Sequence, residues 1–129
     1  MHIEHIALWT TDIERCKGFY ARFFGAIASV PYKNVAKGFE SCFLSFKQGA
    51  RIEVMKTSSL SPVVIEPGAH RMGLTHMAFS AGSIEKVNEL TQSLHDAGYS
   101  IVDGPRHTGD GYYESAALDP DGNRIEITK

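Results

Sequence analysis

Hydrophobic and polar positions follow one pattern twice along the chain. Residues 2–9 look like a strand, because the segment is short and contains isoleucines and a tryptophan. Thr11 then resembles a helix N-cap with Glu14 closing a capping box. Apolar residues follow at helical spacing, and Gly25 is expected to end the helix. The apolar stripe of this predicted helix consists of Ile13, Cys16, Tyr20, Phe23 and Phe24.

The same pattern returns about seventy residues later. Residues 74–80 again look like a strand, Gly82 and Ser83 precede a second amphipathic helix, and Gly98 is expected to end it. The stripe of this helix is Ile84, Val87, Leu90 and Leu94. Equivalent positions keep a steady offset: 76 − 5 = 71, 83 − 12 = 71, 98 − 25 = 73 and 126 − 53 = 73. This register indicates an internal duplication.

Each predicted helix is followed by three strand candidates, so each copy reads as a βαβββ module. The candidates are 26–31, 38–47 and 51–56 in the first copy, and 99–103, 110–118 and 123–128 in the second. We predict a single α+β domain: module 1 at about 1–57, a linker at 58–73 and module 2 at about 74–129. Pseudo-twofold symmetry would relate the modules, with mixed sheets curved around a metal-binding cleft.

Composition and charge narrow the function classes. The 129 residues carry a formal net charge of −2, with 43% apolar and 22% charged residues. No basic run favours nucleic acid, no apolar run is long enough for a transmembrane helix, and the N-terminus lacks a signal-peptide pattern. Cys16 and Cys42 are expected to be reduced core thiols. We expect a cytoplasmic protein that binds a small molecule, without nucleic-acid or membrane partners, and forms a homodimer.

Strand alternation assigns the chemistry to four residues. Ile52 and Val54 should face the helix of their module, as should Ile125 and Ile127, so the intervening glutamates face the other way. His5 and Glu53 occupy the same positions in the first copy as His76 and Glu126 in the second. A single strand glutamate is usually only solvated, but two matched pairs indicate one divalent metal site. Two imidazoles and two carboxylates suit Ni or Zn, with Co, Mn and Fe also possible.

Several motifs resemble the vicinal oxygen chelate superfamily, which includes glyoxalase I, methylmalonyl-CoA epimerase, fosfomycin thiol transferases, extradiol dioxygenases and bleomycin-resistance proteins. They are His5-Ile6-Ala7-Leu8, Gly18-Phe19-Tyr20 with Phe24-Gly25, residues 74–80 (LTHMAFS) and residues 118–126 (LDPDGNRIE). The His–Glu–His–Glu ligand set resembles that of glyoxalase I. This implies isomerisation of a methylglyoxal–thiol hemithioacetal, with Glu126 as first candidate for the base and Glu53 as second.

Two stretches depart from the bacterial glyoxalase I pattern. Ala7-Leu8-Trp9 replaces an arginine that follows the first ligand, and Thr57-Ser58-Ser59 replaces an asparagine. The thiol, the metal and the choice between a site within one chain and one shared by two chains stay open. The alternatives are an epimerase, a thiol transferase, a dioxygenase or a non-catalytic binding protein of the same superfamily.

Other residues carry weaker expectations. By parity, Trp9 and Met55 could line the pocket, and Arg124 lies on the ligand side of its strand. An anionic group of the substrate could be bound by His70 and Arg71. A tyrosine of the segment that contains His107, Tyr112, Tyr113 and Glu114 could hydrogen-bond the substrate. For each of these residues, packing or simple solvation is the competing interpretation.

Overall fold

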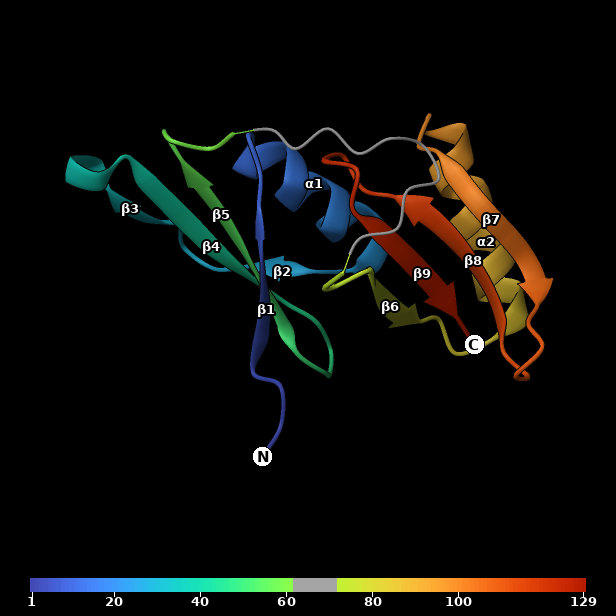
Figure 1. Cartoon of the computed structure of the whole chain (residues 1–129). Helices are drawn as coiled ribbons and strands as arrows, with labels where there is room; N and C mark the ends of the chain where they lie inside the picture. The colour runs from blue at the N-terminus through green and yellow to red at the C-terminus, as the bar shows by residue number, and fades with distance from the viewer. Residues whose placement is uncertain (62–71) are drawn as a thin grey trace. The chain divides into compact units, whose positions relative to one another are not determined.

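The computed structural model describes residues 1–61 and 72–129. The chain divides into two compact units, Met1–Pro67 (unit 1) and Gly68–Lys129 (unit 2). In its described part, each unit has one α-helix and one sheet of mixed strand directions, so the predicted α+β class with two similar modules is confirmed (Figure 1). No helix among the described residues has the length and apolar character needed to cross a membrane.

In unit 1 the first strand pairs with the last. The sheet has the order β1-β5-β4-β2, with β3 also pairing β4. The β1–β5 pair is parallel, and the other pairs are antiparallel. The elements are β1 (His5–Trp9), α1 (Ile13–Phe24), β2 (Ile27–Ala28), β3 (Tyr32–Asn34), the 3-10 helix η1 (Val35–Lys37), β4 (Phe39–Ser45) and β5 (Arg51–Thr57).

Unit 2 repeats this plan with four strands in the order β6-β9-β8-β7. Its β6–β9 pair is parallel, and its other pairs are antiparallel. The helix α2 packs against the sheet that Figure 1 shows beside it. The elements are β6 (His76–Ser80), α2 (Ile84–Asp96), β7 (Ile101–His107), β8 (Tyr113–Leu118) and β9 (Arg124–Thr128).

Each helix covers the apolar face of its own sheet. In unit 1 the fully or nearly fully buried residues are Ile13, Cys16, Phe19 and Tyr20 of α1 with Cys42, Leu44, Ile52 and Val54 of the sheet. In unit 2 they are Val87, Thr91 and Leu94 of α2 with Ala116, Ala117, Ile125 and Ile127. The predicted stripes are therefore correct in direction, but Phe19 and Thr91 take places expected for Phe23 and Leu90. Thr91 is accommodated because its hydroxyl hydrogen-bonds Ser115 at 2.6 Å and donates to the Val87 carbonyl.

Both cysteines are buried thiols, as predicted. Burial raises the pKa of the Cys42 thiol, and a thiol in this state is a poor nucleophile.

Three local predictions were wrong. Thr11 is not the N-cap of α1; Asp12 is, and its carboxylate accepts from the Arg15 amide. The strand expected at 26–31 contains only the two-residue β2, and β3 begins beyond it, just after Pro31, which has no amide to donate to a ladder. β7 runs to His107 rather than ending at 103, because a β-bulge around Asp103 lets the strand continue.

Candidate functional site

The predicted faces of the sheets are confirmed in both units. In unit 1, Ile52 and Val54 lie in the core, while Glu53 pairs with Ala7 in the β1–β5 register and faces away from α1. In unit 2, Glu126 pairs with Ala78 in the same way. Strand alternation therefore gives each unit a face that carries one histidine and one glutamate.

The histidine and glutamate of unit 1 lie side by side. His5 Nε2 is 3.7 Å from Glu53 Oε2, and the two side chains are 38% and 19% exposed. The other ring nitrogen, Nδ1, contacts the carboxylate of Glu4, which also ion-pairs with Arg51. Hydrogen bonding from His5, with a further contribution from Arg51, lowers the pKa of Glu4. An ionised Glu4 can only accept a hydrogen bond, so this contact favours the tautomer with the proton on Nδ1, in which the Nε2 lone pair is on the side of Glu53.

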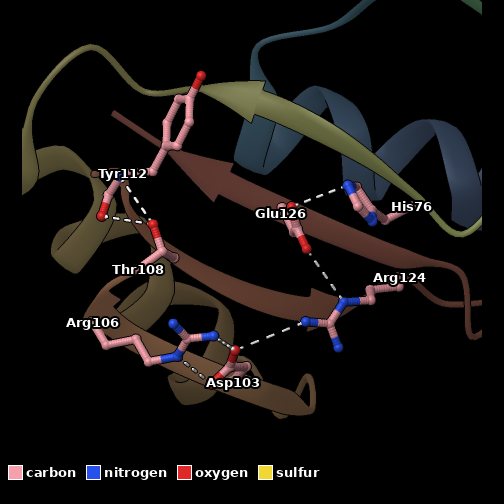
Figure 2. A network of polar contacts seen from close by, with 7 residues as sticks. All are labelled: His76, Asp103, Arg106, Thr108, Tyr112, Arg124 and Glu126. Carbon is pink, nitrogen blue, oxygen red and sulfur yellow. Dashed lines mark hydrogen bonds and ion pairs between the residues drawn. The ribbon is translucent and has the colours of Figure 1, made fainter. Parts of the chain in front are cut away.

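Unit 2 has the equivalent arrangement, shown in Figure 2. His76 Nε2 is 3.1 Å from Glu126 Oε2, and these side chains are 37% and 15% exposed. His76 Nδ1 lies 3.0 Å from the Thr75 hydroxyl. In both units, therefore, the residue just before the histidine contacts Nδ1, and Nε2 faces the carboxylate.

This geometry fits metal ligation. A metal-binding histidine usually donates its second ring N–H to a carboxylate, carbonyl or water, which fixes the tautomer and the ring orientation. Each unit offers one imidazole nitrogen and one carboxylate, which are donors for a borderline divalent ion. Within residues 1–61 and 72–129, no group of three or more His, Cys, Asp or Glu side chains is placed so that it could hold one metal ion. Each unit by itself thus supplies half of the predicted four-ligand set.

Arginines occupy equivalent places beside the two pairs. Arg51 is opposite His5 in the register of unit 1, and Arg124 is opposite His76 in unit 2. Their offset, 124 − 51 = 73, equals that of the two glutamates. The ligand-side position predicted for Arg124 is confirmed: it lies 3.5 Å from Glu126. Sequence reasoning gave no role to Arg51, although this offset was a signal that could have identified it.

Asp103 and Arg106 join the unit 2 site and were missed. Arg106 donates to both carboxylate oxygens of Asp103, at 3.0 and 2.5 Å, and Asp103 lies 4.0 Å from Arg124 (Figure 2). Bonding to Arg106 lowers the pKa of Asp103. A bulge sets the position of Asp103, and the sequence pattern carries no clear signal for it.

Apolar side chains border the unit 1 pair. Trp9 and Met55 pair in the β1–β5 register and share a face with Glu53, as parity predicted. Trp9 is 46% exposed and meets the edge of Phe39 at 6.3 Å. The His5 ring packs edge-on against Phe43 at 5.4 Å.

The remaining candidates separate clearly. Tyr113 donates its hydroxyl to Asn88 of α2 at 2.8 Å, so it lies on the helix-covered face, and His107 packs against it. The Tyr113 hydroxyl therefore already has a partner on the helix, and the expectation that one of the tyrosines hydrogen-bonds the substrate stays a prediction. Glu114 lies on the opposite face, since it pairs with Thr128 of β9, and Tyr112 is exposed. His70 and Arg71 lie outside the described residues.

Comparisons with known proteins agree with this architecture. A family model described as the Glyoxalase/Bleomycin resistance protein/Dioxygenase superfamily matches residues 2–127. An uncharacterized protein of Bacillus subtilis, YqjT, is 30% identical over 97% of this chain and 96% of its own.

Two solved structures illustrate the similarity in fold. A glyoxylase/bleomycin resistance protein/dioxygenase domain from Frankia sp. has a TM-score of 0.82 at 17% identity, over 99% of this chain and 96% of that one. A glyoxalase I mutant from Zea mays has a TM-score of 0.80 at 20% identity. This match covers 98% of the present chain but only 44% of the maize chain.

Proposed function

Because the chain belongs to the Glyoxalase/Bleomycin resistance protein/Dioxygenase superfamily, we propose that it is a metal-dependent lyase of the glyoxalase I type. Its substrate would be a small 1,2-dioxygenated compound, such as the hemithioacetal of methylglyoxal and a thiol. The observation that supports this proposal is the matched His–Glu pair of each unit, with Nε2 facing the carboxylate in both. In this proposal His5, Glu53, His76 and Glu126 together hold one divalent ion, nickel or zinc, in a homodimer.

The chemistry asked of these residues is a proton transfer between neighbouring carbons. When bound, the ion would supply positive charge that stabilises negative charge developing on the two substrate oxygens. Glu126 takes the proton from the carbon that bears the thiol sulfur and returns it to the adjacent carbon. The hydroxyl proton passes from the oxygen of the first carbon to the oxygen of the second, so that the hemithioacetal becomes a 2-hydroxy thioester. Glu53 is the second candidate for the base. Trp9 and Met55 form the apolar wall beside the reacting groups.

The identity of the thiol is a separate part of the proposal. Ala7, Leu8 and Trp9 follow the first ligand, and none of them can pair with a carboxylate of glutathione. We therefore include thiols other than glutathione among the candidates.

A screen of the metal-loaded protein tests the proposed function. Nickel- and zinc-loaded samples would be assayed with methylglyoxal and several thiols, and in parallel with acyl-CoA epimerase substrates. Thioester formation supports the proposal, whereas epimerisation alone would assign the chain to another enzyme of the superfamily. A purified protein that takes up no divalent metal would instead indicate a non-catalytic binding protein.

Substitution of the ligands gives a second test. His5→Ala and Glu126→Gln should each lose most of the metal-dependent exchange of the substrate proton with solvent, because each removes a ligand or the base. Arg22→Gln, on the exposed end of α1, is a control that should keep the activity. Full metal content and full activity in Glu126→Gln would show that Glu126 is not the base.

A further inference from the structure

Arg51 and Arg124 fill the same register position, yet they contact different neighbours. Arg51 ion-pairs with Glu4, the residue before His5, and its guanidinium lies 4.0 Å from the centre of the Phe43 ring. Arg124 ion-pairs with Glu126 at 3.5 Å, through Nε and Oε1. In unit 2, the glutamate beside the histidine, Glu126, therefore forms an ion pair with an arginine. In the described part of unit 1, Arg51 pairs with Glu4 and not with Glu53.

The sequence explains this difference. The residue before His76 is Thr75, which offers no charge to an arginine, whereas Glu4 does so in unit 1. On the neighbouring strand, Phe43 lies opposite Glu53, while the small Ala116 lies opposite Glu126. The Phe43 ring gives Arg51 a surface on which to stack. The small side chain of Ala116 does not block contact between side chains of β9 and those of β7, the strand beyond it.

Asp103 of β7 reaches Arg124 of β9 across this alanine. It pairs with Ala116 in the β7–β8 register, so Asp103, Ala116 and Glu126 form one row across three strands. The bulge at Asp103 is fixed by Gly104, whose φ is +70° and where a Cβ would lie 2.5 Å from the Glu114 carbonyl. Two hydrogen bonds from Arg106 hold the Asp103 carboxylate, which lies 4.0 Å from Arg124 (Figure 2).

We propose that Arg124 is a positioning residue for Glu126, and that Asp103, held by Arg106, keeps Arg124 in that role. Arg124 holds Oε1 of Glu126, so that Oε2 is the oxygen presented beside His76 Nε2. The carboxylate then has one direction before any ion or substrate arrives, and groups that orient a ligand in this way contribute strongly to site function. The inference rests on the proposed function in one respect only, which is that Glu126 is a working carboxylate.

The test compares Arg124→Gln, Arg124→Lys and Asp103→Asn with the wild type and with Arg22→Gln, an exposed arginine on α1, as the matched control. Three measurements are made. Crystal structures of the metal-free proteins give the direction of the Glu126 side chain, chelator competition gives zinc affinity, and kinetics of substrate proton exchange give kcat and KM.

We expect Glu126 to leave His76 or take several rotamers in Arg124→Gln, and kcat or zinc affinity to fall about 10- to 100-fold. KM should change by less than about threefold, because the lost contact orients the reacting carboxylate and does not bind substrate. Arg124→Lys should recover part of the loss, since it keeps the charge without the planar guanidinium. In Asp103→Asn, kcat or zinc affinity should also fall, but by a smaller factor than in Arg124→Gln.

The outcomes separate this inference from the proposed function. If the wild type binds zinc but lacks lyase activity, the proposed function fails, and the crystal structures and zinc affinities still decide the role of Arg124. If the wild type binds no metal, the direction of Glu126 alone decides it. A Glu126 side chain that keeps its direction in Arg124→Gln, in a protein as stable as Arg22→Gln, would overturn the inference.

Discussion

His5 and His76 carry different partners at the same ring nitrogen. Nδ1 of His5 meets the carboxylate of Glu4, and Nδ1 of His76 meets the hydroxyl of Thr75. A partner at Nδ1 fixes the orientation of an imidazole ring. The two rings are therefore oriented by chemically different groups, a carboxylate for His5 and a hydroxyl for His76.

Asp103 gives the clearest pH dependence at this scale. Its pKa is lowered in the folded chain, mainly because Arg106 donates hydrogen bonds to its ionised form. An acid whose pKa is lowered on folding stabilises the protein above its unfolded pKa, and this stabilisation disappears as the pH falls through the folded value. We expect Asp103→Asn to be less stable than the wild type at neutral pH and to approach it below about pH 4, near the usual carboxyl pKa.

Melting temperatures of both proteins between neutral and acid pH check this prediction. The difference between them should shrink as the pH falls. A difference that stays constant or grows would show that the Asp103–Arg106 bond does not couple protonation to folding.

The site residues show what the sequence can specify and what it cannot. Alternation of apolar and polar positions was enough to put Glu53 and Glu126 on the faces away from the helices. The direction of Arg51 depends on its neighbour Glu4 and on Phe43 across the sheet, and the position of Asp103 depends on a bulge. Such cross-strand contacts are properties of register, which one strand's pattern does not contain.

Among the elements, the two helix starts are equivalent to the residue. Asp12 caps α1 and Ser83 caps α2, and each side-chain oxygen accepts from an amide three residues on. Thr11 was predicted instead because it combines with Glu14 in a capping box, a local motif. The offset 83 − 12 = 71 marked Asp12 correctly, since a duplicated register constrains both copies together.

A pair of alanine substitutions tests the cap. Asp12→Ala should destabilise the protein by about 1 kcal/mol, because an amide of the first turn of α1 loses its acceptor. Thr11→Ala, one residue earlier and exposed, should leave the stability nearly unchanged. Denaturant unfolding of both variants measures the effect, and an equal loss in the two would contradict the assignment of Asp12.

The strands were predicted well where their edges were marked by turns and poorly elsewhere. The segment Asp119–Asn123 fixed the start of β9 within one residue, because Asp119 accepts from the amides of Asp121 and Asn123. The end of β7 was missed since Gly104 and Pro105 look like a break. Here Gly104 supplies the positive φ of a bulge instead, and pairing continues to His107.

On the scale of the whole molecule, both units are built on one plan and share one family. The repeat in the sequence predicted two similar modules with mixed sheets, and the motifs resembled the family; both predictions are confirmed. The joining of the two His–Glu pairs around one ion stays a prediction, because it concerns both units at once and sequence offsets only make them equivalent.

Metal stoichiometry tests that prediction. If the four side chains hold one ion, the protein should bind one equivalent of zinc or nickel per chain, and His5→Ala or His76→Ala should each weaken binding of that same equivalent. Four donors that share an ion bind it more tightly than two do, because the later contacts form within an already bound complex. Calorimetric titration measures the ratio, and two equivalents per chain would show that each unit binds its own ion.

In both units the first strand lies parallel to the last. The histidine and the glutamate of a unit therefore become neighbours although they are 48 positions apart in unit 1 and 50 in unit 2. A growing polypeptide cannot bring its imidazole beside its carboxylate until the strand that closes the sheet has been added. An incompletely synthesised or unfolded unit therefore has its histidine without the matching glutamate beside it, and a single histidine binds metal weakly. Metal binding would then require that each unit has folded, and the binding energy would stabilise only fully folded molecules.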